Sequence, residues 1–337
     1  MVAGYLIKPG LVELRQVATP EPSSGEVLVK VMSALTCGTD LKAFLRGHPM
    51  IPMPGMFGHE FSGIISQSGN GVKGFKEGDE VMAVHSAPCL QCRFCKKKLY
   101  NLCEEIMLTK ALGAFAEYIL LPAAVVKQNL FHKPSMLTFE QAAFLEPLSC
   151  VVHGMSGLSI KKDDKVLIIG TGPIGILHLL LLKLSGAQVV ITGLERERLA
   201  LAKNLGADLV VSPSGLAQGI NVFTEGMGVD IVFECTGQLD IWESAVSYVR
   251  RGGTVVLFGG CKKGTKVTYD TYRLHYDELS IKGSFHFTPR DVKKAYTLLN
   301  GTLNVSPLIS GRYPLEDITV ALEKLSHGEG TKYVIIP

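Results

Sequence analysis

The stretch Gly170-Thr171-Gly172-Pro173-Ile174-Gly175 decides the fold of the middle of this 337-residue chain. It has the form G-x-G-x-x-G, follows an apolar run at residues 166–169 and opens a helical pattern at residues 173–185. In such a turn the first glycine permits a tight bend, the second lets the backbone approach a pyrophosphate, and the third allows close helix–strand packing. The helix N-terminus then offers free N–H groups to a phosphate. The stretch predicts a dinucleotide-binding turn, with a plain glycine-rich turn as the alternative.

The pattern around this turn predicts an α/β domain. Apolar strands are expected at residues 165–169, 188–192, 209–211, 230–233, 254–258 and 279–285, and helices at 173–185, 195–205 and 241–249. Strands that alternate with helical crossovers indicate a doubly wound parallel sheet covered on both faces. Before about residue 150, short β-like runs separated by Gly, Pro and Asp indicate an irregular β domain. After residue 289, two helical patterns (291–299 and 315–325) and a terminal strand (332–336) can complete either domain.

Length and composition narrow the class of protein. A chain of 337 residues predicts two domains, and 47% hydrophobic with 19% charged residues favours globular structure over disorder. The net charge of +3 gives no reason to expect a nucleic-acid partner. Residues 1–30 lack a secretory signal pattern, and the most apolar region, 174–191, is interrupted by His178, Lys183 and Gln188. We therefore expect a soluble, cytoplasmic protein that has no membrane partner and whose thiols stay reduced.

Four of the eight cysteines form the pattern C-x2-C-x2-C-x7-C, namely Cys89, Cys92, Cys95 and Cys103. Four thiolates at this spacing are typical of a closed tetrahedral structural zinc site. An iron–sulfur centre is the alternative, because ferredoxin motifs also begin with C-x2-C-x2-C. Those motifs continue with three residues and Cys-Pro, whereas here the gap is seven residues and Glu104 follows the last cysteine. The pattern favours zinc.

A second candidate metal site is dispersed along the first half of the chain. Cys37 and Thr39 offer a thiol and a hydroxyl two residues apart, His59 and Glu60 offer an imidazole and a carboxylate, and Glu146 offers another carboxylate. Taken singly, each of these residue types is more often a packing residue in the core or a solvated residue on the surface. Taken together, one thiolate, one imidazole and one or two carboxylates make the donor set of an open, catalytic zinc site.

The end of the second predicted Rossmann strand bears on the choice of cofactor. An Asp or Glu normally ends this strand and holds the ribose hydroxyl groups, but the expected position is Gly193. Without that carboxylate a 2′-phosphate is not repelled, and Arg196 or Arg198 can pair with it. The alternative is that Glu195 takes the ribose role and both arginines are solvated. The pattern leans slightly to NADP over NAD.

With these motifs in this order, the chain resembles the zinc-dependent medium-chain alcohol and polyol dehydrogenases over nearly its whole length, most closely the sorbitol, threonine and butanediol dehydrogenase branch. The matching segments are residues 37–40, 58–63, the four clustered cysteines, 144–149 and 170–175. The resemblance implies a GroES-like β-barrel domain, residues 1–148 and 289–337, with a Rossmann domain, residues 149–288, inserted in it. It also implies an active site in the cleft between the domains and a homo-oligomer, either a dimer or a tetramer.

The resemblance further implies roles for single residues. Cys37 and His59 would be direct ligands of the catalytic zinc, Glu60 and Glu146 would complete the shell, and Thr39 would take the alcohol proton. Zinc lowers the pKa of a bound alcohol, and hydride then passes to the nicotinamide. Residues that follow the later Rossmann strands are placed to meet the nicotinamide half of the cofactor. They are Thr236, Phe258, Gly259, Ser284 and Phe285.

Three positions depart from the pattern of the sorbitol-type enzymes. These enzymes have a His three positions after the hydroxyl that takes the alcohol proton, and Lys42 stands at that position here. The group that accepts the proton from Thr39 is therefore undecided, with His48 and the ribose hydroxyls as candidates. His286 and Phe287 stand where polyol enzymes resemble Arg-Tyr, which weakens the case for sorbitol itself.

The expected activity is hydride transfer between a secondary alcohol, a polyol or sugar alcohol, and NAD(P). A threonine-type amino alcohol dehydrogenase is the alternative within the family. A zinc-independent enone reductase would leave four residues unexplained together, namely Cys37, His59, Glu60 and Glu146. A non-enzymatic zinc-binding protein would require the open zinc set to have decayed, yet none of its expected ligands is missing.

Overall fold

The computed structural model describes residues 1–337 and divides them into two compact units. The first unit comprises Met1–Val152 and His286–Pro337, and the second comprises His153–Phe285. The sequence pattern put these borders a few residues away, at 148/149 and 288/289. The first border differs because helix α5 (Leu145–Met155) runs through it without a break, so no turn residue marks where the chain passes from one unit to the next.

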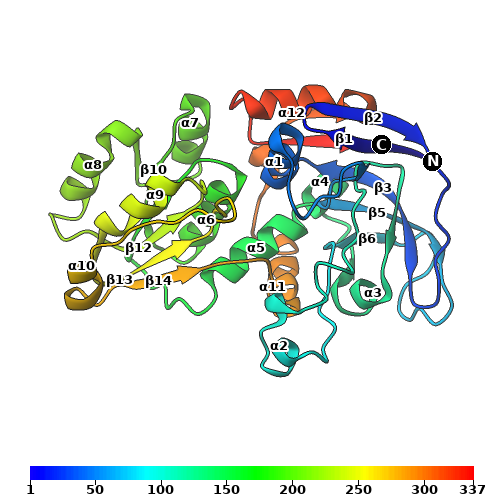
Figure 1. Ribbon diagram of the computed structural model, residues 1–337, viewed down its shortest axis with the longest axis horizontal. Helices are drawn as coiled ribbons and strands as arrows, with labels where there is room; N and C mark the ends of the chain where they lie inside the picture. Colours follow the sequence, from blue (N-terminus) through cyan, green and yellow to red (C-terminus); the bar gives the residue numbers. More distant parts are fainter. The chain divides into compact units, whose positions relative to one another are not determined.

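The second unit is built on one parallel sheet of six strands in the order β11-β10-β9-β12-β13-β14, which confirms the predicted doubly wound arrangement. Figure 1 shows this unit as the green-to-orange part of the ribbon. The strand order reverses between β9 and β12, the point where such sheets bind ligands beyond their carboxyl ends. The strands are β9 (Lys165–Ile169), β10 (Gln188–Thr192), β11 (Leu209–Val211), β12 (Val229–Glu234), β13 (Val249–Leu257) and β14 (Ser280–Gly283).

Helices connect these strands, and apolar side chains between them form the core of the unit. Leu167, Val190, Val232 and Val255, one from each of four neighbouring strands, are fully buried in it. The helices are α6 (Pro173–Leu184), α7 (Arg196–Asn204), α8 (Leu216–Phe223), α9 (Leu239–Ser244) and α10 (Thr271–Tyr276).

One helix of this unit is shorter than the sequence pattern predicts. The expected helix at 241–249 ends at Ser244, a short 3-10 turn follows at Ala245–Ser247, and Val249 already belongs to strand β13. Val249 pairs with Val229 of β12, so sheet pairing overrides the local helical pattern.

The first unit contains a seven-stranded sheet and a three-stranded sheet. The larger sheet has the order β15-β16-β3-β5-β6-β8, with β7 paired to β3, and the smaller has the order β2-β1-β4. Strand β16 pairs antiparallel with β3, so residues 332–336 join the same sheet as residues 27–35. The strands are β1 (Val2–Lys8), β2 (Leu11–Gln16), β3 (Val27–Leu35), β4 (Gly55–Met56), β5 (Phe61–Ser68), β6 (Glu80–Ala83), β7 (Tyr118–Leu121), β8 (Leu130–His132), β15 (Ile309–Pro314) and β16 (Lys332–Ile336).

The helices of the first unit occur in the segments of the chain that connect these strands. They are α1 (Gly38–Arg46), α2 (Arg93–Lys96), α3 (Ala123–Asn129), α4 (Phe139–Ala142), α5, α11 (Pro289–Leu299) and α12 (Ile318–Ser326). Helix α11 begins with a capping box: the Thr288 hydroxyl accepts from the backbone N–H of Asp291, whose carboxylate accepts from the Thr288 N–H. None of the helices of the chain has the combined length and apolar character that crossing a membrane requires.

Candidate active site and metal centres

Pairing between strands β3 and β5 brings Cys37 and His59 to one place. Ala34 of β3 pairs with Phe61 of β5, and the N–H of Leu35 donates to the carbonyl oxygen of Glu60 at 2.9 Å. The residues just after β3 and just before β5 therefore lie at the same edge of the sheet. Cys37 then caps helix α1, with its sulfur accepting from the N–H of Thr39 at 3.4 Å.

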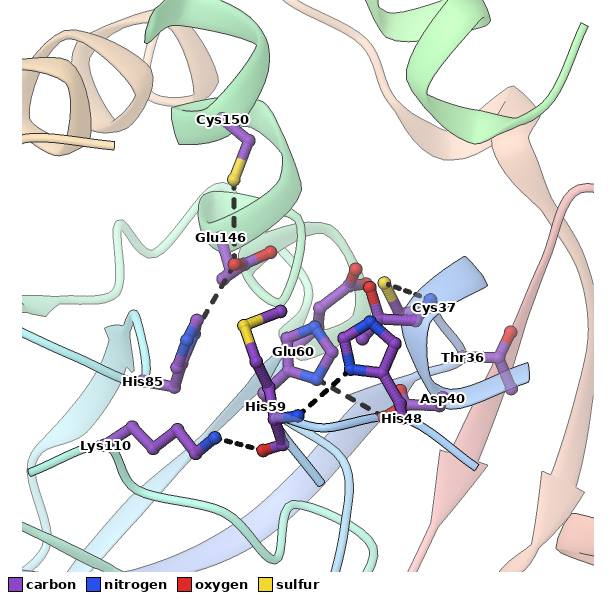
Figure 2. Close-up of polar contacts among 12 residues, drawn as sticks. Thr36, Cys37, Asp40, His48, His59, Glu60, His85, Lys110, Glu146 and Cys150 are labelled. Carbon is purple, nitrogen blue, oxygen red and sulfur yellow. Dashed lines mark hydrogen bonds and ion pairs between the residues drawn. The ribbon is translucent and has the colours of Figure 1, made fainter. Parts of the chain in front are cut away.

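Helix α5 adds Glu146 to this edge, and the result is a buried cluster of ligand atoms (Figure 2). The ligand atoms of His59, Glu60 and Glu146 all lie within 4.8 Å of one another, and so do those of Cys37, Asp40 and His59. The four residues proposed from the sequence as an open zinc set are thus gathered in the folded chain. Thr39 lies beside them in the first turn of α1, partly exposed.

A buried lysine holds one of the carboxylates. The ammonium of Lys332, in strand β16, donates to Oε2 of Glu60 and to the carbonyl oxygen of Thr36, the latter at 2.8 Å. Both side chains of the ion pair are almost completely buried. Burial raises the pKa of Glu60 to about 7, although Lys332 acts in the opposite direction. Oε1 of Glu60 is buried and has no hydrogen-bond partner, so it is a lone acceptor that faces the cluster.

Glu146 and His59 each have a buried polar neighbour as well. Oε1 of Glu146 lies 3.4 Å from Nδ1 of His85. Burial alone would raise the pKa of Glu146, but His85 and His59 lower it to about 2. Nδ1 of His59 lies 3.4 Å from Oδ1 of Asp40. Burial alone would lower the pKa of His59, but Asp40 and Cys37 raise it well above its ordinary value.

These residues fit a zinc ion. The donor set of thiol, imidazole and carboxylate is the one that open zinc sites use, and the unpartnered Oε1 of Glu60 is the kind of buried atom that a cation satisfies. Asp40 also fits, because a ligating imidazole usually donates its second N–H to a carboxylate, which fixes the ring.

The four clustered cysteines form a separate site around helix α2. Their ligand atoms lie within 4.8 Å of one another, and the sulfur atoms of Cys89 and Cys95, like those of Cys92 and Cys103, are 4.0 Å apart. A tetrahedron of sulfurs about 2.3 Å from a zinc ion has edges of roughly 3.8 Å, so the spacing suits zinc. The N–H of Cys95 lowers the pKa of Cys92 to about 6, which favours the thiolate form.

The glycine-rich turn of the second unit has the close approaches that its sequence predicts. A Cβ on Gly175 would overlap the carbonyl oxygen of Gly170, so only glycine lets α6 begin this close to β9. A Cβ on Gly193 would overlap the hydroxyl of Thr171. Any side chain at position 193 would therefore have to displace Thr171.

Glu195, which follows, is held by two neighbours. Its carboxylate oxygens lie 3.4 Å from the hydroxyl of Thr171 and 3.7 Å from the guanidinium of Arg198. Arg196, the other candidate for a 2′-phosphate, is exposed.

A buried carboxylate orders the strand ends that were expected to meet the nicotinamide. Glu234, the last residue of β12, accepts from the N–H groups of Thr236 and Gly237 at 2.6 and 3.0 Å, and its carbonyl oxygen accepts from those of Phe258 and Gly259. The hydroxyl oxygen of Ser284 is buried without a partner, and Phe285 beside it is 45% exposed.

Comparisons with known proteins agree with this geometry. The model of the alcohol dehydrogenase GroES-like domain matches residues 23–131, and that of the zinc-binding dehydrogenase domain matches residues 173–301. The D-arabitol-phosphate dehydrogenase of Enterococcus avium is 34% identical over 327 residues, 94% of this chain and 92% of that protein. This chain belongs to the zinc-dependent medium-chain dehydrogenases, among the polyol dehydrogenases.

Two further proteins extend the comparison. The sorbitol dehydrogenase of Halalkalibacterium halodurans is 31% identical over 331 residues, 94% of each chain. A solved structure from Sinorhizobium meliloti, described as a zinc-binding dehydrogenase bound to NADP, is 31% identical with a TM-score of 0.88 and covers 100% of this chain and 99% of that one.

Within this dehydrogenase, the residues that replace the Arg-Tyr pair of polyol enzymes lie next to Glu146. Nε2 of His286 is 2.7 Å from the hydroxyl of Ser86, and the rings of His286 and Phe287 both contact His85. Sequence reasoning missed His85, Ser86 and Lys332, since each acquires its role through a contact between segments far apart in the chain. For Lys332, the one signal in the sequence is a charged residue at the start of an otherwise apolar strand, which suggests that its ammonium has a buried partner.

Proposed function

We propose that this NAD(P)-dependent zinc dehydrogenase interconverts a polyol or sugar alcohol with its ketone, acting on a secondary alcohol. The observation that carries the proposal is a pair of ligand groups in the first unit that share His59: one also contains Cys37 and Asp40, the other Glu60 and Glu146, and the ligand atoms of each group lie within 4.8 Å of one another. The names of the relatives, D-arabitol-phosphate dehydrogenase and sorbitol dehydrogenase, support a polyhydroxylated substrate.

In the proposed site, Cys37 and His59 hold the catalytic zinc together with Glu60 or Glu146. The zinc, when bound, lowers the pKa of an alcohol enough for its proton to leave near neutral pH. Asp40 keeps the His59 ring in place through Nδ1, and Lys332 keeps the Glu60 carboxylate turned so that Oε1 stays free. The hydroxyl of Thr39, two residues after Cys37, takes the alcohol proton and passes it outward.

The cofactor is proposed to bind the turn of Gly170, Gly172, Pro173, Ile174 and Gly175 through its pyrophosphate, and to be NADP sooner than NAD. Gly193 brings no carboxylate that would repel a 2′-phosphate, and the NADP in the Sinorhizobium relative supports this choice. Arg196 and Arg198 would pair with the phosphate. The nicotinamide half would meet the strand ends, at Thr236, Phe258, Gly259, Ser284 and Phe285.

The cluster of Cys89, Cys92, Cys95 and Cys103 is proposed to hold a second, structural zinc. Thiolate ligands stay free for metal in a reducing compartment, so we propose a cytoplasmic location. Family likeness leads us to propose a homo-oligomer, a dimer or a tetramer.

A panel of simple alcohols, polyols and L-threonine, each with NAD and with NADP, tests this function. Reduction of the nicotinamide is followed by its absorbance in the zinc-loaded enzyme. We expect the highest kcat/KM with a polyol and NADP. A clear preference for L-threonine would replace the polyol proposal with an amino alcohol dehydrogenase, and a strong preference for NAD would remove the 2′-phosphate assignment.

A further inference from the structure

Basic side chains surround His48 at one side of the buried cluster. Lys42 and Arg46 lie on helix α1, which begins at Cys37, and the ammonium of Lys110 donates to the carbonyl oxygen of Met50. The N–H of Met50 in turn lies 3.3 Å from Nδ1 of His48. Figure 2 shows Lys110 extended toward the segment that carries His48, and Asp40, which faces His59, also acts on His48. Three cations thus gather within two short segments next to the proposed catalytic zinc site.

These positive charges have no counterion in the folded chain. Lys42, Arg46 and Lys110 form no ion pair, and the only carboxylate that acts on His48 is Asp40, which is fully buried and turned to His59. Burial followed by the charges of Lys42 and Lys110 lowers the pKa of His48, and burial also lowers the pKa of Lys110. A half-buried ammonium whose partner is a single carbonyl oxygen is costly, and an anion would offset that cost.

The chemistry of the patch indicates what kind of anion fits. Lysine is a compact point charge that commonly binds phosphate, and two lysines with an arginine can share one phosphate dianion. The hydroxyl groups of an uncharged polyol can accept hydrogen bonds from such donors, but they carry no negative charge to offset three cations, so the patch suits an anionic group better.

We propose that Lys110, together with Lys42 and Arg46, binds the phosphate of a phosphorylated sugar alcohol whose hydroxyl reacts at the site of Cys37 and His59. This inference rests on the proposed polyol dehydrogenase function and names the substrate class within it. It also accounts for the absence of the Arg-Tyr pair, because a phosphate anchor replaces contacts to the sugar hydroxyls. The Enterococcus relative, named for arabitol phosphate, is consistent with it.

The test compares D-arabitol phosphate and galactitol 1-phosphate with the two unphosphorylated alcohols, using zinc-loaded full-length enzyme and NADP. The variants are Lys110→Met, Lys110→Arg as the conservative change, and Lys73→Met as an exposed-lysine control in the same unit. We expect wild type to prefer the phosphorylated alcohols by at least about tenfold in kcat/KM, because a charge-assisted contact carries about that much or more.

Lys110→Met should reduce this preference about ten- to a hundredfold, mainly through KM, whereas Lys110→Arg keeps most of it and Lys73→Met keeps all of it. Raising the salt concentration should weaken the preference in wild type. Equal use of both alcohol classes by wild type, or an unchanged preference in Lys110→Met, would overturn the proposal. A rise in the KM for NADP alone would assign the cations to a cofactor phosphate and overturn it too.

Loss of the proposed function is a separate outcome. If no alcohol of either class is oxidised, calorimetric titration of D-arabitol phosphate into the same proteins still judges the phosphate site. Binding to wild type that is lost in Lys110→Met supports the site, and absence of binding to wild type refutes it.

Discussion

A buried histidine behind the cofactor turn should make the enzyme lose stability in mild acid. His178 lies in helix α6 with no exposed surface, packed against Phe233 and Phe258. Its Nδ1 is 2.9 Å from the carbonyl oxygen of Ile174, within the glycine-rich turn, and its Nε2 has no partner. Because a carbonyl oxygen can only accept, Nδ1 carries the proton and the ring is neutral. Burial lowers the pKa of His178 to about 4.

The sign and size of the effect follow from linkage. In the unfolded chain His178 has a pKa of 6.5, so below that pH the unfolded state takes up a proton that the folded state does not. The stability that the neutral ring provides is fully present above pH ~6.5 and is lost as the pH falls toward the folded pKa. Lowering the pH from ~7.5 to ~5.0 should thus remove about 2 kcal/mol of the free energy of unfolding.

The variant His178→Gln isolates this contribution, because glutamine keeps a donor for Ile174 and does not titrate. Urea unfolding of wild type and variant at both pH values gives the two differences in the free energy of unfolding. Other titrating groups affect both proteins alike, so wild type should lose about 2 kcal/mol more than the variant. An equal loss in the two proteins would refute the reasoning that the ring stays neutral in the folded state.

Three further changes test other parts of the structure. Cys92→Ser should lower the melting temperature, because closed zinc sites contribute folding free energy, and should reduce the zinc content by one ion per chain. A melting temperature equal to that of wild type would contradict a structural site. Lys332→Met should cost roughly 1–3 kcal/mol of the free energy of unfolding in metal-free protein, since the buried carbonyl oxygen of Thr36 loses its donor and Glu60 takes up a proton in place of its ion pair; an unchanged free energy of unfolding would contradict a stabilising role of Lys332. Arg198→Leu should raise the KM for NADP about tenfold or more and change that for NAD little; equal changes would favour the alternative that Glu195 binds the ribose.

The parts of the fold that the sequence predicts are those set by local pattern. The turn at Gly170 and the apolar strands of the second unit depend on neighbours a few residues away, so spacing alone indicates them. The start of β13 at Val249 does not, because it depends on pairing with Val229 of another strand. The border inside α5 is hidden for a similar reason, since a continuous helix carries no turn signal.

The candidate site divides in the same way. Residue type and order suggested Cys37, His59, Glu60 and Glu146 as ligands, and the pairing of β3 with β5 explains how the first three meet. Lys332 could not be found by spacing, because it lies 272 residues from the carboxylate that it holds. Asp40 stands in a quoted motif, yet its contact with His59 exists only after α1 and the segment before β5 have come together.

The measurement that tests the account most directly is the activity and metal content of Cys37→Ser. Alcohol-dependent reduction of NADP, binding of NADPH by fluorescence, and zinc per chain are measured together. Cys261→Ser serves as the matched control, because serine can donate the same hydrogen bond to the carbonyl oxygen of Gly237. We expect the turnover of Cys37→Ser to fall about a thousandfold or more and its zinc content to fall by one ion per chain, while cofactor binding and the cysteine-cluster zinc remain. Full turnover in Cys37→Ser would contradict this expectation.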